Sequence, residues 1–284
     1  MLRPRRVRFP GNADMLELTD NHPDTAVQES EYTRLLGYPK RHVLKERSRE
    51  LADQANQWYA ANGRPWIYAR QVNAVELTGG TVRLDGTDFT SKRLHDQFAR
   101  AQSDGAVLAA VSAGPECEEH ARQLWQEGKP DEYFFLEIFG STVVEHLITV
   151  ASGHICGWAD QQGLAVLPHY SPGYSGWDIS DQVKLWQLLR ESGTRHVNGR
   201  LDVLETGMLR PKKSQLAVFG ITRHLEKVRD LARLIPCENC SLPKCRYRRA
   251  PYRHARPQLA EVRALLARAL DDFGGRTEIS SESR

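Results

Sequence analysis

The chain has 284 residues, of which 40% are hydrophobic and 26% charged, and its formal net charge is +3 at pH 7. These values are typical of a globular protein with a real core, and they exclude the polycations that coat nucleic acids. No apolar run approaches the roughly 20 residues of a membrane helix. The basic N-terminus lacks the apolar segment and cleavage site of a secretory signal. We therefore expect a cytoplasmic protein that has no membrane partner.

The residue pattern predicts an α+β fold in which helices pack on a largely antiparallel sheet, with five parts along the chain. They are a disordered basic and polar arm (1–30), an N-terminal helix–hairpin lobe (31–104), the core (105–235), a cysteine-rich basic segment (236–256), and a C-terminal helix with a disordered tail (257–284).

In the first lobe, apolar residues at helical spacing predict a helix over residues 41–61. Residues 65–84 are typical of two strands joined by a hairpin turn at Gly79-Gly80. Ser91 follows Thr90 and predicts an N-cap for a short helix that ends near Ala101.

The core begins with an apolar run over residues 105–114, which predicts a buried strand. Pro115 then starts a helix that ends near Gln126. Residues 133–153 are apolar nearly all round, and such a helix is buried at the centre of a domain.

Glu145 lies in the middle of this apolar helix, where a carboxylate is costly to bury unless it is paired. Two interpretations stay open. Either Glu145 lies at the edge of the buried stripe and binds a local backbone group or an arginine, or it projects into a pocket and accepts hydrogen bonds from the amine of a ligand.

Further along, Ser180 and Asp181 predict the cap of a helix that Gly193 ends. Residues 201–209 and 214–222 then predict two strands on either side of the tetrapeptide RPKK. That tetrapeptide contains Arg210 and Lys212 and is either a solvated hairpin corner or a contact for an anionic group of a cofactor.

The sequence PHYSPGYSGW, residues 168–177, combines turn-forming glycines and prolines with large aromatic residues. A plain turn gains nothing from exposed rings, and a central strand does not accept the prolines. This combination favours a rigid loop that holds a flat ligand.

Three cysteines, Cys237, Cys240 and Cys245, have the spacing C-x₂-C-x₄-C. In a cytosolic protein this spacing favours a metal site over a disulfide, because the C-x₂-C turn directs two sulfur atoms to one point. The metal is either zinc, with His224 or His254 as a fourth ligand, or an iron–sulfur cluster. The isolated Cys117 and Cys156 are expected to be small buried hydrophobic residues.

Several segments together resemble the activation domain of vitamin B12-dependent methionine synthase, in particular its stand-alone short forms. The matching segments are residues 105–128 (GAVLAAVSAGPECEEHARQLWQEG), 135–147 (FLEIFGSTVVEHL), 171–189 (SPGYSGWDISDQVKLWQLL) and 204–221 (LETGMLRPKKSQLAVFGI). They occur in the family's order, and the resemblance covers roughly residues 31–222.

This resemblance implies a domain that binds S-adenosylmethionine in a groove lined by Pro172, Gly173 and Tyr174. It implies that Glu145 pairs with the ammonium group of the methyl donor. His169 stands where the family has an arginine that binds the methionyl carboxylate, so that contact falls to His169 or moves to Arg210 or Lys212.

The resemblance also implies partners. The cobalamin is held by a corrinoid-binding methyltransferase module, and a flavodoxin or a ferredoxin is the electron donor for its reduction. The chain is then a stand-alone component that supports reductive remethylation of the partner's corrinoid, and whether it is itself an enzyme stays open.

Two other functions stay open from the residues alone. The fold could serve as a binding module whose cysteine cluster and basic segment contact a protein or a nucleic acid, although the small net charge argues against nucleic acid. Alternatively, the chain is an iron–sulfur electron-transfer protein for a corrinoid enzyme.

Overall fold

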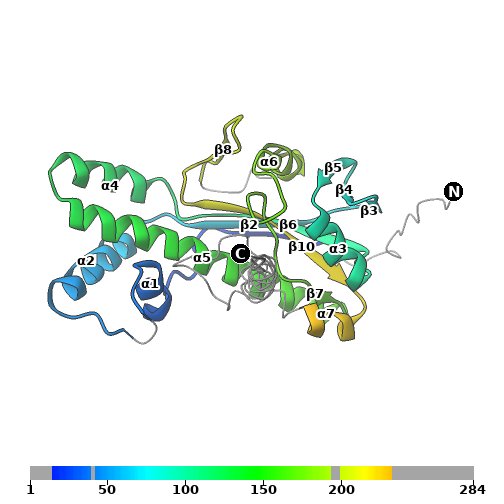
Figure 1. The fold of residues 1–284 in the computed structure, drawn as a ribbon, viewed down its shortest axis with the longest axis horizontal. Helices are drawn as coiled ribbons and strands as arrows, with labels where there is room; N and C mark the ends of the chain where they lie inside the picture. The colour runs from blue at the N-terminus through cyan, green and yellow to red at the C-terminus, as the bar shows by residue number, and fades with distance from the viewer. Residues whose placement is uncertain (1–14, 40–41, 193–198, 232–284) are drawn as a thin grey trace, which may run out of the picture. The chain divides into compact units, whose positions relative to one another are not determined.

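The computed structural model describes residues 15–39, 42–192 and 199–231, which belong to one compact unit ending at Leu234. Its centre is an antiparallel sheet with the strand order β1-β2-β6-β10-β7 (Figure 1). These strands are β1 (Glu17–Asp20), β2 (Trp66–Gln71), β6 (Gly105–Ser112), β10 (Ser214–Thr222) and β7 (Ala165–Val166). The predicted α+β class is confirmed.

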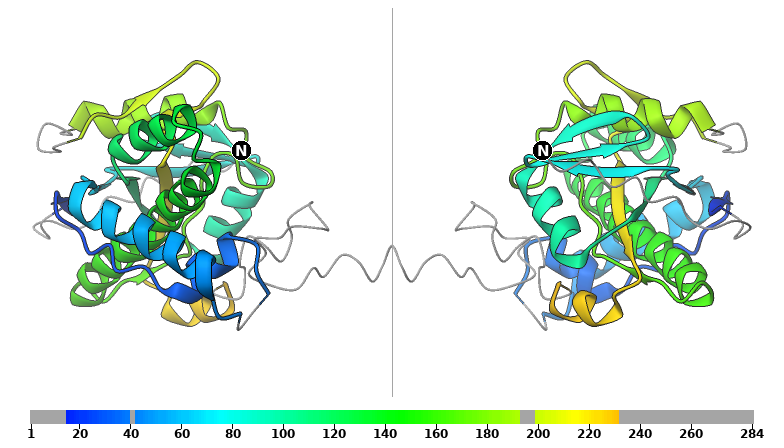
Figure 2. Two further views of the ribbon diagram at one scale, coloured as in Figure 1. Left: turned by 90° about the vertical axis from the view of Figure 1, so that its left-hand side faces the viewer. Right: turned by 90° about the vertical axis from the view of Figure 1, so that its right-hand side faces the viewer.

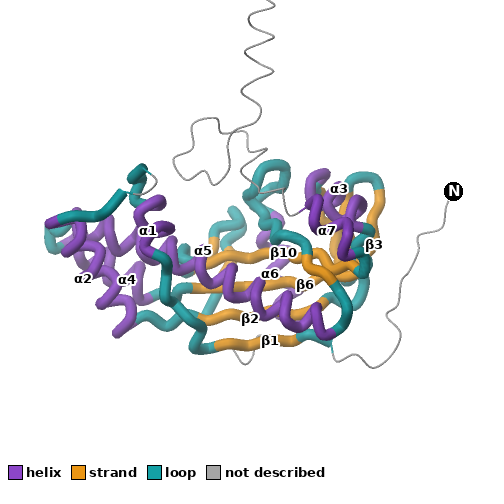
Figure 3. Tube along the Cα trace, turned by 90° about the horizontal axis from the view of Figure 1, so that it is seen from below, coloured by secondary structure: helices purple, strands orange, loops and turns teal. Residues whose placement is uncertain are grey.

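Helices cover one face of the sheet. Figure 3 shows β10, β6, β2 and β1 side by side, with α5 in front of them. Alternate sheet residues, among them Val107, Ala109 and Phe219, form one hydrophobic core with this helical layer. The layer consists of α1 (Glu29–Leu35), α2 (Glu46–Asn62), α4 (Glu116–Gln126) and α5 (Pro130–Gln161).

The opposite face carries a second core, built from the intervening sheet residues such as Tyr68, Leu108 and Val218. Figure 2 shows α6 on the other side of the sheet from α1 and α2. This layer consists of the sheet β3 (Val75–Thr78), β4 (Thr81–Leu84) and β5 (Thr87–Thr90), helices α3 (Lys92–Ala101) and α6 (Asp181–Ser192), and the hairpin β8 (Asp202–Val203) and β9 (Leu209–Arg210). Helix α7 (Leu225–Leu231) follows β10.

The long helix α5 explains why its sequence is apolar nearly all round. Its side chains pack against the sheet on one side and against α1, α2 and α4 on the other, so twelve of its residues are buried. By length and composition this helix could cross a membrane, so the expectation that no apolar run approaches that length was wrong. Its burial inside the protein instead identifies it as a core helix, as the sequence predicted.

Several predicted elements are confirmed close to their predicted bounds. Ser91 caps α3, because its hydroxyl oxygen accepts a hydrogen bond from the Leu94 backbone N–H over 3.3 Å. Gly79 and Gly80 form the β3–β4 turn with positive φ angles of 56° and 90°. Cys117 is fully buried as expected, whereas Cys156 is exposed.

The predicted domain boundaries need two corrections. Residues 17–20 form β1, which pairs with β2, and α1 begins at Glu29, so the described part of the predicted arm contains regular structure. Strand β2 pairs with β6 in the central sheet, so residues 31–104 are not a separate lobe. Strand β1 is too short and polar to show a strand pattern in the sequence. Its pairing with β2 stabilises it.

Two strand predictions were wrong in detail. Residues 201–209 do not form one strand, since the chain turns at Leu204–Gly207 between β8 and β9. The run before Gly79 also breaks after Gln71, and β3 then joins a separate sheet.

A buried ion pair holds this small sheet against the central one. Arg70 Nη1 on β2 lies 3.2 Å from Asp85 Oδ2, and Arg70 Nη2 donates to the Leu188 carbonyl of α6 over 2.6 Å. Asp85 also accepts from the backbone N–H groups of Asn73 and Ala74.

Replacing Asp85 by alanine should therefore lower the free energy of unfolding by about 3 kcal/mol, because it leaves the buried Arg70 charge unpaired. The matched control is Asp88→Ala, which breaks an exposed pair with Arg83 and should destabilise the protein much less than Asp85→Ala does. Urea denaturation of both variants measures the difference, and equal losses would contradict the assignment.

Candidate functional site

The segment that the sequence singled out runs along the outer edge of β10. Val166 pairs with Ile221, the Leu167 N–H donates to the Gly220 carbonyl over 2.8 Å, and Tyr170 exchanges backbone hydrogen bonds with Val218. Residues 166–170 therefore act as an irregular last strand, and the turn that follows starts from a fixed position at this edge.

Two of the aromatic residues in this segment belong to the core. Tyr170 and Trp177 are each 3% exposed, and their rings stack with centroids 6.1 Å apart. Phe89 packs edge-on against Trp177, whose indole N–H donates to Asp181 Oδ2 over 2.9 Å. The expectation that these rings offer surfaces to a flat ligand is wrong for Tyr170 and Trp177, which instead anchor the loop.

The turn between these anchors presents the Pro-Gly-Tyr sequence. Pro172 is buried, Gly173 is exposed with a φ angle of 90°, and Tyr174 is half-buried. Backbone hydrogen bonds from Tyr174 to Ser171 and from Trp177 to Tyr174 close the turn. A positive φ angle suits glycine at position 173, and this geometry directs the Tyr174 side chain back toward β10.

A polar cluster forms where Tyr174 meets the edge strand. The Gln215 amide nitrogen donates to the Tyr174 hydroxyl over 2.9 Å and to the Ser171 hydroxyl over 3.1 Å. His169 Nε2 lies 3.3 Å from the same Tyr174 hydroxyl, and the His169 ring contacts Phe219. The structure thus joins the predicted His169 and Tyr174 with Ser171 and Gln215, which the sequence analysis missed.

Glu145 lies half-buried on α5. Glu137, Ser141 and Glu145 follow one another at four-residue intervals and therefore share one side of the helix. Lys213, just before β10, donates to Ser141 Oγ over 2.8 Å and lies 3.1 Å from Glu137 Oε2.

Helix α5 and strand β10 run in the same direction. Lys213 binds the first half of α5, while the end of α5 leads into β7, which pairs with the end of β10. Along this direction, Glu145 lies four residues beyond Ser141 on the helix, and Gln215 lies two residues beyond Lys213. That Glu145 lies near the cluster at Tyr174 stays a prediction.

The basic tetrapeptide at residues 210–213 has a different environment from the cluster. Lys212 Nζ lies 2.9 Å from Glu137 Oε1, and the backbone N–H groups of Lys212 and Lys213 donate to the Glu118 carboxylate. Arg210 is exposed on β9 opposite Asp202. The anions that the structure places beside these lysines are carboxylates of α4 and α5.

Burial alone would raise the pKa of the Glu137 carboxyl, but Lys212 and Lys213 together outweigh this effect and hold it below its usual value. The same contact raises the pKa of Lys212, although partial burial opposes it. These charges fasten the start of β10 to α5.

The predicted metal ligands Cys237, Cys240 and Cys245 lie outside the described residues, as does His254. Within the described ranges, no group of three histidine, cysteine, aspartate or glutamate side chains is placed to hold a metal ion.

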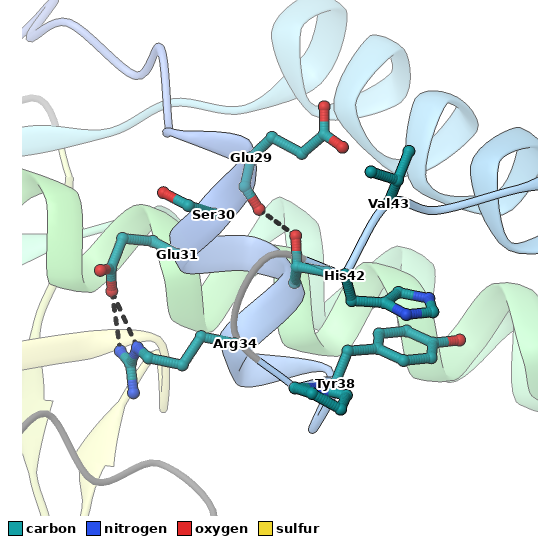
Figure 4. Close-up of a pocket in the computed structure, with 9 residues that line it drawn as sticks. Glu29, Ser30, Glu31, Arg34, Tyr38, His42 and Val43 are labelled. Carbon is teal, nitrogen blue, oxygen red and sulfur yellow. Dashed lines mark hydrogen bonds and ion pairs between the residues drawn. The ribbon is translucent and has the colours of Figure 1, made fainter.

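Two surface cavities lie on the helical layer, and none of the predicted site residues lines them. One of about 460 Å³ borders α1, where Tyr38 and His42 stack and Glu31 pairs with Arg34 (Figure 4). The other, of about 370 Å³, lies among α2, α4 and α5 beside the stacked Trp58 and His120.

Comparison with known proteins identifies the fold. No family model and no curated protein sequence matches the chain. The structure is similar to the solved structure of a reactivation domain. In this chain the fold is an antiparallel sheet with helices packed on it.

The solved structure in question is the crystal structure of the MetH reactivation domain bound to AdoHcy. The TM-score is 0.55 at 11% sequence identity, over 78% of this chain and 85% of that chain. At this identity the similarity establishes the fold.

Replacing Glu137 by glutamine should lower the free energy of unfolding at pH 7 by about 2 kcal/mol, because the half-buried Lys213 loses its charged partner. Since the folded-state pKa of Glu137 is lowered, its stabilising effect is present above the unfolded pKa of about 4.3 and is lost as the pH falls through the lower folded value.

The difference between wild type and Glu137→Gln should therefore be largest near pH 7 and shrink below about pH 4.3 in urea denaturation experiments. Glu119 is an exposed glutamate in the first turn of α4, and Glu119→Gln is the matched control, with a much smaller expected difference at pH 7 than Glu137→Gln. A difference in the free energy of unfolding that stays constant with pH would contradict the role given to the Glu137 charge.

Proposed function

We propose that this chain is a reactivation component of a cobalamin-dependent methyltransferase of the methionine synthase type. It would bind S-adenosylmethionine or a closely related ligand at the cluster of His169, Tyr174 and Gln215, and dock on a partner module that holds the corrinoid. The fold similarity to a reactivation domain solved with AdoHcy carries this proposal.

The chemistry of the cluster supports a ligand of this class. S-adenosylmethionine combines a flat base, hydroxyl groups, an ammonium and a carboxylate. The cluster offers hydroxyl and imidazole groups for hydrogen bonds, and the half-buried Glu145 carboxylate on α5 suits the ammonium.

The position of Pro172 and Gly173 supports the same assignment. Gly173 is exposed at the tip of the turn, where the absence of a side chain lets a ligand approach the backbone closely. Buried Pro172 and the Tyr170–Trp177 stack fix that turn on the core. The site is thus largely formed before the ligand arrives, which lowers the entropic cost of binding.

The corrinoid of the partner would supply the methyl-accepting chemistry. The role of this chain would be to position the methyl donor next to the partner's cofactor and to exclude water from the contact. Reduction of that cofactor would require an electron donor such as a flavodoxin or a ferredoxin.

Calorimetric titration of the full chain with AdoHcy tests the binding function. Tyr174→Phe should weaken binding about fivefold, since it removes the hydroxyl that Gln215 and His169 contact. Tyr38→Phe is the matched control, because the Tyr38 hydroxyl lies 3.2 Å from Ser48 Oγ beside the α1 cavity, and it should leave the affinity unchanged. Absence of binding to the wild type, alone and with a corrinoid module, would sink the proposal.

His169→Arg tests where the ligand carboxylate lies. A guanidinium forms a charged bidentate contact that an imidazole cannot form, so the variant should bind AdoHcy about tenfold more tightly if the carboxylate lies at this position. An unchanged affinity in the same titration would assign the carboxylate contact to Lys212 or Arg210 instead. In that case Lys212→Met should weaken binding.

A further inference from the structure

Gln215 has an unusual position in β10. The strand is apolar from Leu216 to Ile221, and all of these residues are buried. Gln215 lies just before them, on the face shared with Ala217 and Phe219, and it is half-buried. Its side chain is therefore accessible from the edge of the sheet but anchored on a rigid strand.

The carboxamide of Gln215 bonds two hydroxyl groups through its nitrogen. Both hydrogen bonds found for it among the described residues, to Ser171 Oγ and to the Tyr174 hydroxyl, involve the amide nitrogen. An amide nitrogen has two N–H donors, and both are used in this way. The amide oxygen is the group that remains to form a further hydrogen bond, and it can act there as an acceptor.

The Tyr174 ring lies next to this carboxamide, and its side chain is half-buried and so partly accessible. A partly exposed ring suits a flat aromatic ligand, which can pack on its face. A ring bound there presents its polar edge to the Gln215 carboxamide.

From this arrangement we infer that Gln215 is a specificity-determining residue that recognises the exocyclic amino group of a purine base. The amide oxygen accepts a hydrogen bond from the amino group, while the amide nitrogen keeps the bonds to Ser171 and Tyr174 that the structure shows. The inference rests on the proposed function, because it assigns the base end of the same ligand.

The site should therefore reject a purine in which the amino group is replaced by an oxo group. With the amide in the orientation shown, two oxygen acceptors would then face each other. Sites that hydrogen-bond a substrate group discriminate strongly against analogues that lack it, because a polar group of the protein is left unpaired.

The experiment compares AdoHcy with S-inosylhomocysteine, the analogue that has an oxo group in place of the adenine amino group, by calorimetric titration of the full chain. The wild type should prefer AdoHcy by about tenfold or more. In Gln215→Leu the preference should fall to about one, because the loss is confined to AdoHcy. Gln215→Glu, which keeps an acceptor oxygen, should retain a preference for AdoHcy.

Gln57→Leu serves as the matched control, because Gln57 is an exposed glutamine on α2, and this variant should keep the wild-type preference. Thermal unfolding checks that each variant is folded. If wild type binds neither ligand, the proposed function fails. If wild type binds both ligands equally, or if Gln215→Leu keeps the preference, the role of Gln215 is overturned while ligand binding stands. If Gln215→Leu does not fold, the wild-type comparison still tests the preference for the amino group, and Gln215→Glu still tests the role of Gln215.

Discussion

The backbone pairing between residues 166–170 and the outer edge of β10 is the constraint on which the candidate site depends. An unpaired strand edge would expose N–H and C=O groups, and this segment satisfies part of that edge while it leads the chain into the Pro-Gly-Tyr turn. Val166 packs against the α5 core, whereas Leu167 and Tyr170 belong to the core on the opposite face. His169 lies between Leu167 and Tyr170 in the sequence, and its ring is next to the Tyr174 ring.

The charged contacts at the start of β10 complete the geometry. Lys212 and Lys213 fasten this end of the strand to Glu137 on α5 and to Glu118 on α4. Since α5 and β10 run in the same direction, this contact sets which residues of the helix lie opposite which residues of the strand. Glu137 and Ser141 are thereby joined to Lys213, from which they are separated by many residues in the sequence.

Much of the fold could be predicted because its signals are local. The apolar strand at 105–112, the cap at Ser91 and the apolar strand at 214–222 each carry their own pattern. For the candidate site, Glu145 stood out as a carboxylate on an apolar helix and Tyr174 as an aromatic residue in a turn, whereas His169 came from the family resemblance, and the roles of all three stay predictions. Burial of Trp177 could not be predicted, because its partner Phe89 is remote in the sequence. Gln215 was missed although a signal existed, namely an amide at the accessible end of an apolar strand.

The anchoring of the loop by two buried aromatic residues has a consequence for how this site can change in evolution. The side chains that hold the backbone, Tyr170 and Trp177, are different from those that face the candidate ligand. Substitutions at positions 169, 171, 174 and 215 can therefore change the preferred ligand without altering the path of the chain. A fold that separates its supporting residues from its contact residues can diverge widely in sequence and still present a binding edge of the same shape.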